Sequence, residues 1–169
     1  MTRNHGDSDP NRQYETWKRG ATNEQGTDKK QPDLPTYLNY NKLVFHEGTW
    51  PDVLGKTLTI DFKRNELELR SIEEGIRTCS ITMAEAIAFK SKLELSHMAT
   101  WAEEYHPPVG VCVLDGNSWY LKLYNGRKLV KETYGCNGLP PGREWNNFYA
   151  VITRSYNFAL ARGQTKSVG

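Results

Sequence analysis

The sequence lacks the features that mark several large classes of protein. It contains only three cysteines, Cys79, Cys112 and Cys136, which are odd in number and show no CxxC spacing, so neither a disulfide framework nor a zinc or redox dithiol is expected. It has no run of about 18 apolar residues, the length that a membrane-spanning helix needs. Residues 1–10 lack the basic and apolar regions of a secretory signal. We therefore expect a cytoplasmic protein with no membrane segment.

The motifs of common enzymes are missing as well. The chain has no GxSxG nucleophile elbow, no Walker A loop, no GxGxxG after a strand and no HExxH pair. His97, Glu103, Glu104 and His106 cluster, but the two histidines are nine residues apart and would lie on nearly opposite faces of a helix, so we predict no metal site and no cofactor. Cys136 has no neighbouring base in the sequence that would activate it. A non-catalytic protein is favoured, and an unfamiliar enzyme using Cys136 or His97 stays open as an alternative.

The chain has the length and composition of one domain with a polar arm. Its 169 residues include 37% hydrophobic side chains, with five Trp, nine Tyr and five Phe, which is enough material for one core. Residues 1–38 contain hardly an aliphatic side chain, so they cannot bury enough surface to offset the entropy of ordering them. We predict a disordered, flexible arm over residues 1–38, a single α+β domain over residues 39–162 and a flexible tail over residues 163–169.

Alternating patterns in the first half of the domain predict antiparallel strands. Residues 57–62 and 66–70 place apolar side chains at every second position, which is the period of a strand with one buried face. The short turn between them makes these two segments a hairpin. Residues 43–45 and 76–81 are predicted as further strands.

A helix is predicted to follow these strands. Thr82 and Glu85 have the spacing of a capping box, in which each side chain satisfies the backbone amide of the other at a helix start. Apolar residues then continue at helical spacing as far as Trp101 and Tyr105, with a kink or break expected at residues 96–97. The prolines at positions 107 and 108 end the segment, because proline has no amide to donate.

The second half predicts a three-stranded β-meander and a C-terminal helix. The strands of the meander cover residues 109–114, 118–124 and 127–134. Asp-Gly and Asn-Gly pairs separate them, and these pairs favour tight turns because glycine accepts positive φ. From Trp145 to Ala159 apolar side chains recur with the spacing of an amphipathic helix. The order of strands, helix, strands and helix predicts an α+β fold.

Tryptophans and turns follow one another in a distinctive order in this half. The chain shows W-x-x-x-Y at Trp101 and Tyr105, D-G-x-x-W-x-L at residues 115–121, a glycine turn at 126, G-x-N at residues 135–137, a proline at 140 or 141, and Phe148. Over about residues 82–155 this order resembles a domain of many uncharacterised bacterial proteins. The resemblance implies no biochemical activity. The chain departs from that pattern in its longer loop at residues 138–142 and in its polar arm.

The net charge of +2 is unevenly distributed along the chain. Residues 1–38 contain 6 basic and 6 acidic side chains, residues 39–107 contain 8 and 11, and residues 108–169 contain 8 and 3. The basic C-terminal part favours an acidic partner or nucleic acid, although an ordinary solvated surface also explains it. The candidate binding surface consists of Tyr120, Lys122, Tyr124, Arg127, Lys128, Lys131, Asn137 and Arg143.

Two interpretations apply to the loop at residues 135–142 and to Trp119. In the structural interpretation the indole ring fills the space between helix and sheet, and Asn137 bonds to backbone groups of an irregular loop. In the functional interpretation the same residues form a rim that holds a peptide or a carbohydrate. We favour the structural interpretation.

These patterns predict a non-catalytic macromolecular interaction protein whose partner is another protein. An inhibitor carried by a phage or a mobile element, for example one that acts like an anti-CRISPR protein, would fit because such proteins are often small and lack enzyme motifs. The alternative is nucleic-acid binding through the basic, tyrosine-containing C-terminal meander, since Tyr120, Lys122 and Tyr124 share one face of a strand.

Overall fold

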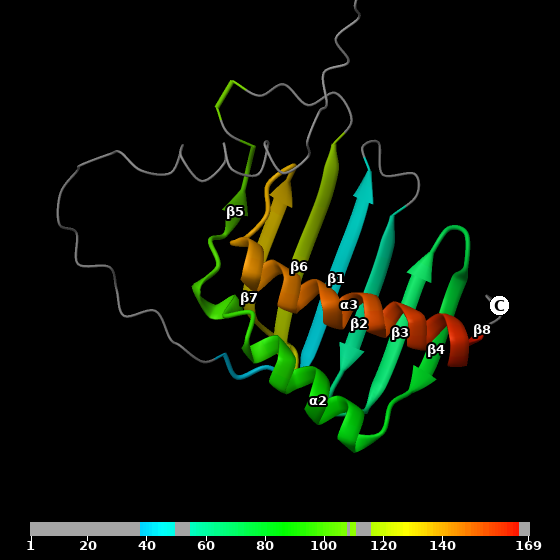
Figure 1. The fold of residues 1–169 in the computed structure, drawn as a ribbon. Helices are drawn as coiled ribbons and strands as arrows, with labels where there is room; N and C mark the ends of the chain where they lie inside the picture. The colour runs from blue at the N-terminus through cyan, green and yellow to red at the C-terminus, as the bar shows by residue number, and fades with distance from the viewer. Residues whose placement is uncertain (1–37, 50–54, 108, 111–115, 166–169) are drawn as a thin grey trace, which may run out of the picture. The chain divides into compact units, whose positions relative to one another are not determined.

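The fold is built on one sheet of eight strands, seen in a computed structural model (Figure 1). The structure describes residues 38–49, 55–107, 109–110 and 116–165. Apart from Leu38, the predicted arm at residues 1–38 lies outside the described residues. The strands are β1 (Lys42–Thr49), β2 (Lys56–Asp61), β3 (Glu66–Ser71), β4 (Gly75–Ser80), β5 (Glu104–Tyr105), β6 (Asn117–Asn125), β7 (Lys128–Cys136) and β8 (Gln164–Thr165).

The order of the strands across the sheet is β5-β7-β6-β1-β2-β3-β4-β8. Neighbouring strands are antiparallel except β5 and β7, which are parallel. Two helices, α2 (Met83–Glu94) and α3 (Gly142–Arg162), lie on the same side of the sheet (Figure 1). The α+β fold predicted from the sequence is confirmed.

The local patterns explain why these elements form. Leucine and isoleucine side chains at alternate positions of β2 and β3 are buried against the helices, so one face of this hairpin is apolar. At the start of α2 the Thr82 hydroxyl accepts a hydrogen bond from the Glu85 amide, and the Glu85 carboxylate accepts one from the Thr82 amide. The predicted capping box is therefore present.

The helix after Thr82 is shorter than its apolar spacing predicts. It ends at Glu94, and His97 adopts a left-handed conformation with a φ of 48°. A single 3₁₀ turn, η1 (Met98–Thr100), follows, and Trp101 is then extended and buried. Its indole Nε1 donates a hydrogen bond to the Ser96 carbonyl at 2.8 Å. The predicted break at residues 96–97 is thus the end of α2, and the turn that follows it is 3₁₀ and not a second α-helix.

The meander differs from its prediction in one strand. Strands β6 and β7 form the expected hairpin, but the other neighbour of β6 is β1, paired over Lys42 to Thr49. The two neighbours of β6 in the sheet are therefore β1 and β7. Val109 and Gly110 form a turn, and residues 111–115 lie outside the described residues. β1, which is distant in the sequence, pairs with β6 at the position that the local pattern had predicted for residues 109–114.

Two residues of the predicted tail take part in the sheet. Gln164 and Thr165, which form β8, pair with Thr78 and Arg77 of β4. The backbone packs tightly between α3 and β8, since a Cβ on Gly163 would lie 2.1 Å from the carbonyl oxygen of Ala159. Residues 166–169 lie outside the described residues.

An aromatic cluster fills the space between α3 and the sheet. The rings of Trp119 and Trp145 lie 5.0 Å apart, and Phe148 lies 5.1 Å from Phe45 and 5.3 Å from Trp101. Phe45, Trp101, Trp119 and Phe148 are all buried. Tilted and edge-to-face contacts of this kind add to the stabilisation from burial. This cluster fixes the N-terminal half of α3 on the sheet.

Candidate functional site

The side of the sheet opposite α2 and α3 is covered by no described helix (Figure 1). We call this side the open face. Its side chains alternate along each strand with the buried ones, so the burial patterns and the strand register identify them. It includes Lys42, Val44, His46, Thr57, Thr59, Asp61, Glu66, Glu68, Arg70, Tyr120, Lys122, Tyr124, Glu132 and Tyr134.

Aromatic rings form a row across the open face. The strand register places His46 of β1, Tyr120 of β6 and Tyr134 of β7 side by side. The rings of His46 and Tyr120 stack at 5.0 Å with an angle of 12° between their planes. His46 Nδ1 lies 2.9 Å from the hydroxyl of Thr57, which belongs to the next strand. Cross-strand contacts of this kind hold the rings in place.

Lysine side chains lie over two of the tyrosines. The Nζ atom of Lys122 is 5.3 Å from the centre of the Tyr120 ring, and that of Lys42 is 4.9 Å from the centre of the Tyr124 ring. These distances fall within the range of cation–π contacts. The predicted grouping of Tyr120, Lys122 and Tyr124 on one strand face is confirmed in its geometry.

Acidic side chains offset the positive charge of the open face. Lys122 forms an ion pair with Glu132 at 3.0 Å, and this hydrogen bond raises the pKa of the lysine above its ordinary value. Arg70 pairs with Glu68 at 2.7 Å. The open face therefore has mixed charge, with most of its cations already near a carboxylate. A surface adapted to the phosphate backbone would instead show an excess of positive charge.

The remaining basic candidates lie elsewhere. Arg127 and Lys128 are exposed at the turn between β6 and β7, next to the end of the open face. Arg143 is exposed in the first turn of α3, on the helix side of the sheet. Lys131 also lies on the helix side, opposite the buried Leu123, and its Nζ donates a hydrogen bond to the Trp101 carbonyl. Partial burial lowers the pKa of Lys131.

Asn137 holds the loop that follows β7. It adopts a left-handed conformation with a φ of 55°, and its Oδ1 accepts a hydrogen bond from the Asn117 amide at 2.9 Å. The indole Nε1 of Trp119 donates to the Gly138 carbonyl at 2.9 Å. A Cβ on Gly135 would lie 2.3 Å from that same indole nitrogen. The loop is thus packed around a buried tryptophan, as the structural interpretation expects.

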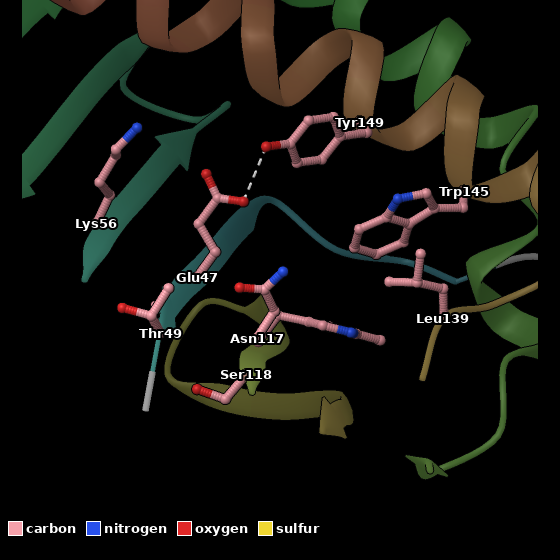
Figure 2. Close-up of a pocket in the computed structure, with 10 residues that line it drawn as sticks. Glu47, Thr49, Lys56, Asn117, Ser118, Leu139, Trp145 and Tyr149 are labelled. Carbon is pink, nitrogen blue, oxygen red and sulfur yellow. Dashed lines mark hydrogen bonds between the residues drawn. The ribbon is translucent and has the colours of Figure 1, made fainter. Parts of the chain in front are cut away.

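A cleft lies on the helix side, where the sheet extends past α3 (Figure 2). We call it the end cleft, and its volume is about 460 Å³. The ends of β1, β2 and β6 form its floor, and α3 forms one wall. Its lining residues are Glu47, Gly48, Thr49, Lys56, Asn117, Ser118, Trp119, Leu139, Trp145 and Tyr149.

Glu47 is the residue of this cleft that the sequence prediction missed. It occupies the same inward-facing row of β1 as Leu43 and Phe45, where alternation leads one to expect an apolar side chain. Its carboxylate accepts a hydrogen bond from the Tyr149 hydroxyl at 2.9 Å (Figure 2). Burial and this carboxylate raise the pKa of Tyr149 to about 12. An acidic residue that interrupts an apolar alternation was the available signal in the sequence.

The candidate catalytic and metal residues are not brought together. His106 Nε2 lies 2.9 Å from Glu104 Oε2, and His97 is held apart from them at the end of α2. The Sγ atom of Cys136 has the Asn137 amide at 3.8 Å as its hydrogen-bond neighbour. In the described parts of the chain no three His, Cys, Asp or Glu side chains are grouped so as to hold a metal ion.

No protein-family model matches this chain, and searches of curated proteins and of solved structures found no match. The resemblance over residues 82–155 to a bacterial domain therefore stays a hypothesis. Across the described residues, no helix is long and apolar enough to cross a membrane.

Proposed function

We propose that this chain is a non-catalytic interaction protein that binds another protein through the open face. The observation that carries the proposal is the row of His46, Tyr120 and Tyr134, which stands on a sheet face that no described helix covers. Tyrosine is enriched in protein interfaces because its ring supplies contact area at a low cost in side-chain entropy and its hydroxyl can hydrogen-bond.

The charge pattern favours a protein as the partner. Lys122 with Glu132, and Arg70 with Glu68, give the open face both signs of charge. A protein surface can complement such a pattern, which then contributes to specificity and to the orientation of the partner. Inhibition of the bound partner, as by proteins of phages and mobile elements, is one form that this function takes in our proposal.

Nucleic-acid binding is the second candidate. It is favoured by Tyr120 and Tyr124, which offer stacking platforms beside Lys122, and by the exposed Arg127 and Lys128 at the adjoining turn. Bases stack on such rings while cations bind the phosphates. The ion pairs on the open face count against it, because a polyanion would have to compete with Glu132 and Glu68 for the same cations.

The test is capture of partners from a lysate of the source organism. Tagged wild-type chain, a Tyr120→Ala/Tyr134→Ala variant and an Ile87→Ala control are compared, because Ile87 is 59% exposed on α2, on the helix side. We expect the wild type and the control to retain the same nuclease-resistant protein, and the double variant to lose it. Equal capture by all three would refute binding through the open face. Recovery of nuclease-sensitive material alone would favour the second candidate.

A further inference from the structure

The end cleft contains a carboxylate in an unusual place for a strand of this sheet. The strand register aligns Lys56, Glu47 and Trp119 in one row on the helix side, where the neighbouring row at Phe45 is fully buried. Glu47 is half-buried at the bottom of the cleft, between α3 and the strand ends (Figure 2). A half-buried charge is costly unless it has a partner that compensates for its lost hydration.

The side chains closest to the Glu47 carboxylate on α3 are neutral phenols. Tyr149 donates its hydroxyl to the carboxylate, and burial, together with this carboxylate, raises the pKa of Tyr156. Glu47 forms no ion pair with any described residue. Lys56 is the nearest cation in the register, but its Nζ lies over the Tyr156 ring, 5.4 Å from the ring centre. Among the described residues, the Glu47 carboxylate thus has a hydrogen bond from one phenol and no ion-pair partner.

Aromatic rings line the cleft beside this carboxylate. Trp145 and Tyr149 lie one helical turn apart on α3, and their rings stack at 5.6 Å with an angle of 19°. Trp119 adds a third ring, 5.0 Å from Trp145. The faces of such rings attract cations, and a planar cation gains stacking as well. An anion would be repelled by Glu47.

We propose that the end cleft is a binding site for an organic cation with a guanidinium or amidinium group. The planar group would stack against Trp145 and donate hydrogen bonds to the Glu47 carboxylate, whose oxygens can accept more than one donor. Asn117, Ser118 and Thr49 add polar groups to the lining of the cleft. The volume of about 460 Å³ is large enough for an arginine side chain, since ligand pockets usually measure roughly 300–1,000 Å³. This site is separate from the open face and does not depend on the function proposed there.

The test uses N-acetylarginine amide and its neutral counterpart, N-acetylcitrulline amide, in calorimetric titrations of the full chain. We expect the arginine compound to bind, and the citrulline compound to bind at least about tenfold more weakly, a difference of about 1.4 kcal/mol. The guanidinium group belongs either to a peptide or to a small molecule. A capped tripeptide with a central arginine distinguishes these two sources. Tighter binding of the tripeptide identifies a peptide ligand, and equal binding identifies a small guanidine.

Four variants, one of them a control, locate the site. Glu47→Gln keeps the shape and removes the charge, so it should weaken binding of the arginine compound at least about tenfold. Lys56→Gln removes the neighbouring positive charge and should bind at least as tightly as the wild type. Ile87→Ala, on the exposed side of α2, should bind like the wild type. Trp145→Phe reports on the stacking contact if Glu47→Gln proves unstable, and it should bind more weakly.

Four results would each overturn the proposal. They are no binding of the arginine compound by the folded wild type, equal binding of the arginine and citrulline compounds, unchanged binding by folded Glu47→Gln, and a loss of affinity in Lys56→Gln. The last result would show that Lys56 contributes to binding of the arginine compound and does not oppose it.

Discussion

The two faces of the sheet use aromatic side chains in different ways. On the helix side, Phe45, Trp101, Trp119 and Phe148 are buried and contact one another. On the open face the rings of Tyr120 and Tyr124 contact a histidine or a lysine, and Tyr134 keeps 41% of its surface exposed. Contact among rings stabilises a core, whereas exposed rings beside polar groups are available to a partner. We therefore propose that the rings on the helix side stabilise the fold and that those on the open face bind a protein partner.

Among the variants that test this contrast, Trp119→Ala is expected to have the largest effect on stability. The indole is 5% exposed, contacts four other rings and donates to the Gly138 carbonyl. Its removal should lower the free energy of unfolding by about 3–5 kcal/mol. Chemical denaturation measures this. A change near zero would mean that the ring does not belong to the core.

Gly135→Ala tests how tightly the same tryptophan is enclosed. The added methyl group would lie 2.3 Å from Trp119 Nε1 and 2.4 Å from the Gly138 carbonyl oxygen. Both neighbours would have to move, which should cost about 1–3 kcal/mol of stability. Gly126→Ala is not a matched control, because Gly126 has a positive φ. Unchanged thermal stability of Gly135→Ala would contradict the packing described for this loop.

High pH should lower the stability of the fold, because Tyr149 on the helix side loses its proton. Its pKa is raised to about 12 in the folded chain, against about 10 for a free tyrosine. A raised folded pKa means that the neutral phenol contributes its stability in full below pH of about 10 and loses it as the pH rises towards about 12. Denaturation at several pH values should show stability falling across this window. The fall should be smaller in Tyr149→Phe, and an identical slope in both proteins would count against this assignment.

The smallest effect on stability is expected from Tyr120→Ala on the open face. The ring contacts His46 and Lys122 but is only half-buried. A cross-strand pair of this kind contributes about 0.2–1 kcal/mol, while loss of the ring should abolish or strongly weaken capture of a partner. Thermal unfolding and partner capture, measured on one preparation, separate the two effects. A loss of stability as large as that of Trp119→Ala would remove the contrast between the faces.

Local sequence patterns predicted which residues form strands and helices better than they predicted which strands lie side by side in the sheet. The hairpin of β2 and β3, the capping box at Thr82 and helix α3 follow from alternation, cap chemistry and helical spacing, all of which are properties of adjacent residues. The insertion of β1 between β2 and β6 joins segments about 80 residues apart, from Leu43 to Leu123. A short stretch of sequence does not indicate such a pairing, since the stability of the pairing comes from burial of the whole sheet face.

Two particular residues show why the candidate surface was predicted only in part. Lys131 would share a face with Lys122 in a regular hairpin, but the irregularity between Leu123 and Tyr124 shifts the register and turns Lys131 to the helix side. Glu47 belongs to the end cleft because Tyr149, 102 positions later, reaches its carboxylate. Both outcomes depend on tertiary structure, although the acidic residue in an apolar row was visible in the sequence.

The central claim is that a partner binds the open face and leaves the helix side free. Oxidative footprinting of the captured complex tests it most directly, because the free and bound chains are compared residue by residue. We predict that Tyr120, Tyr124 and Tyr134 become protected in the complex while Met83, which is 62% exposed on α2, stays reactive. Protection of Met83 with unchanged reactivity of the three tyrosines would place the partner on the helix side and contradict the claim.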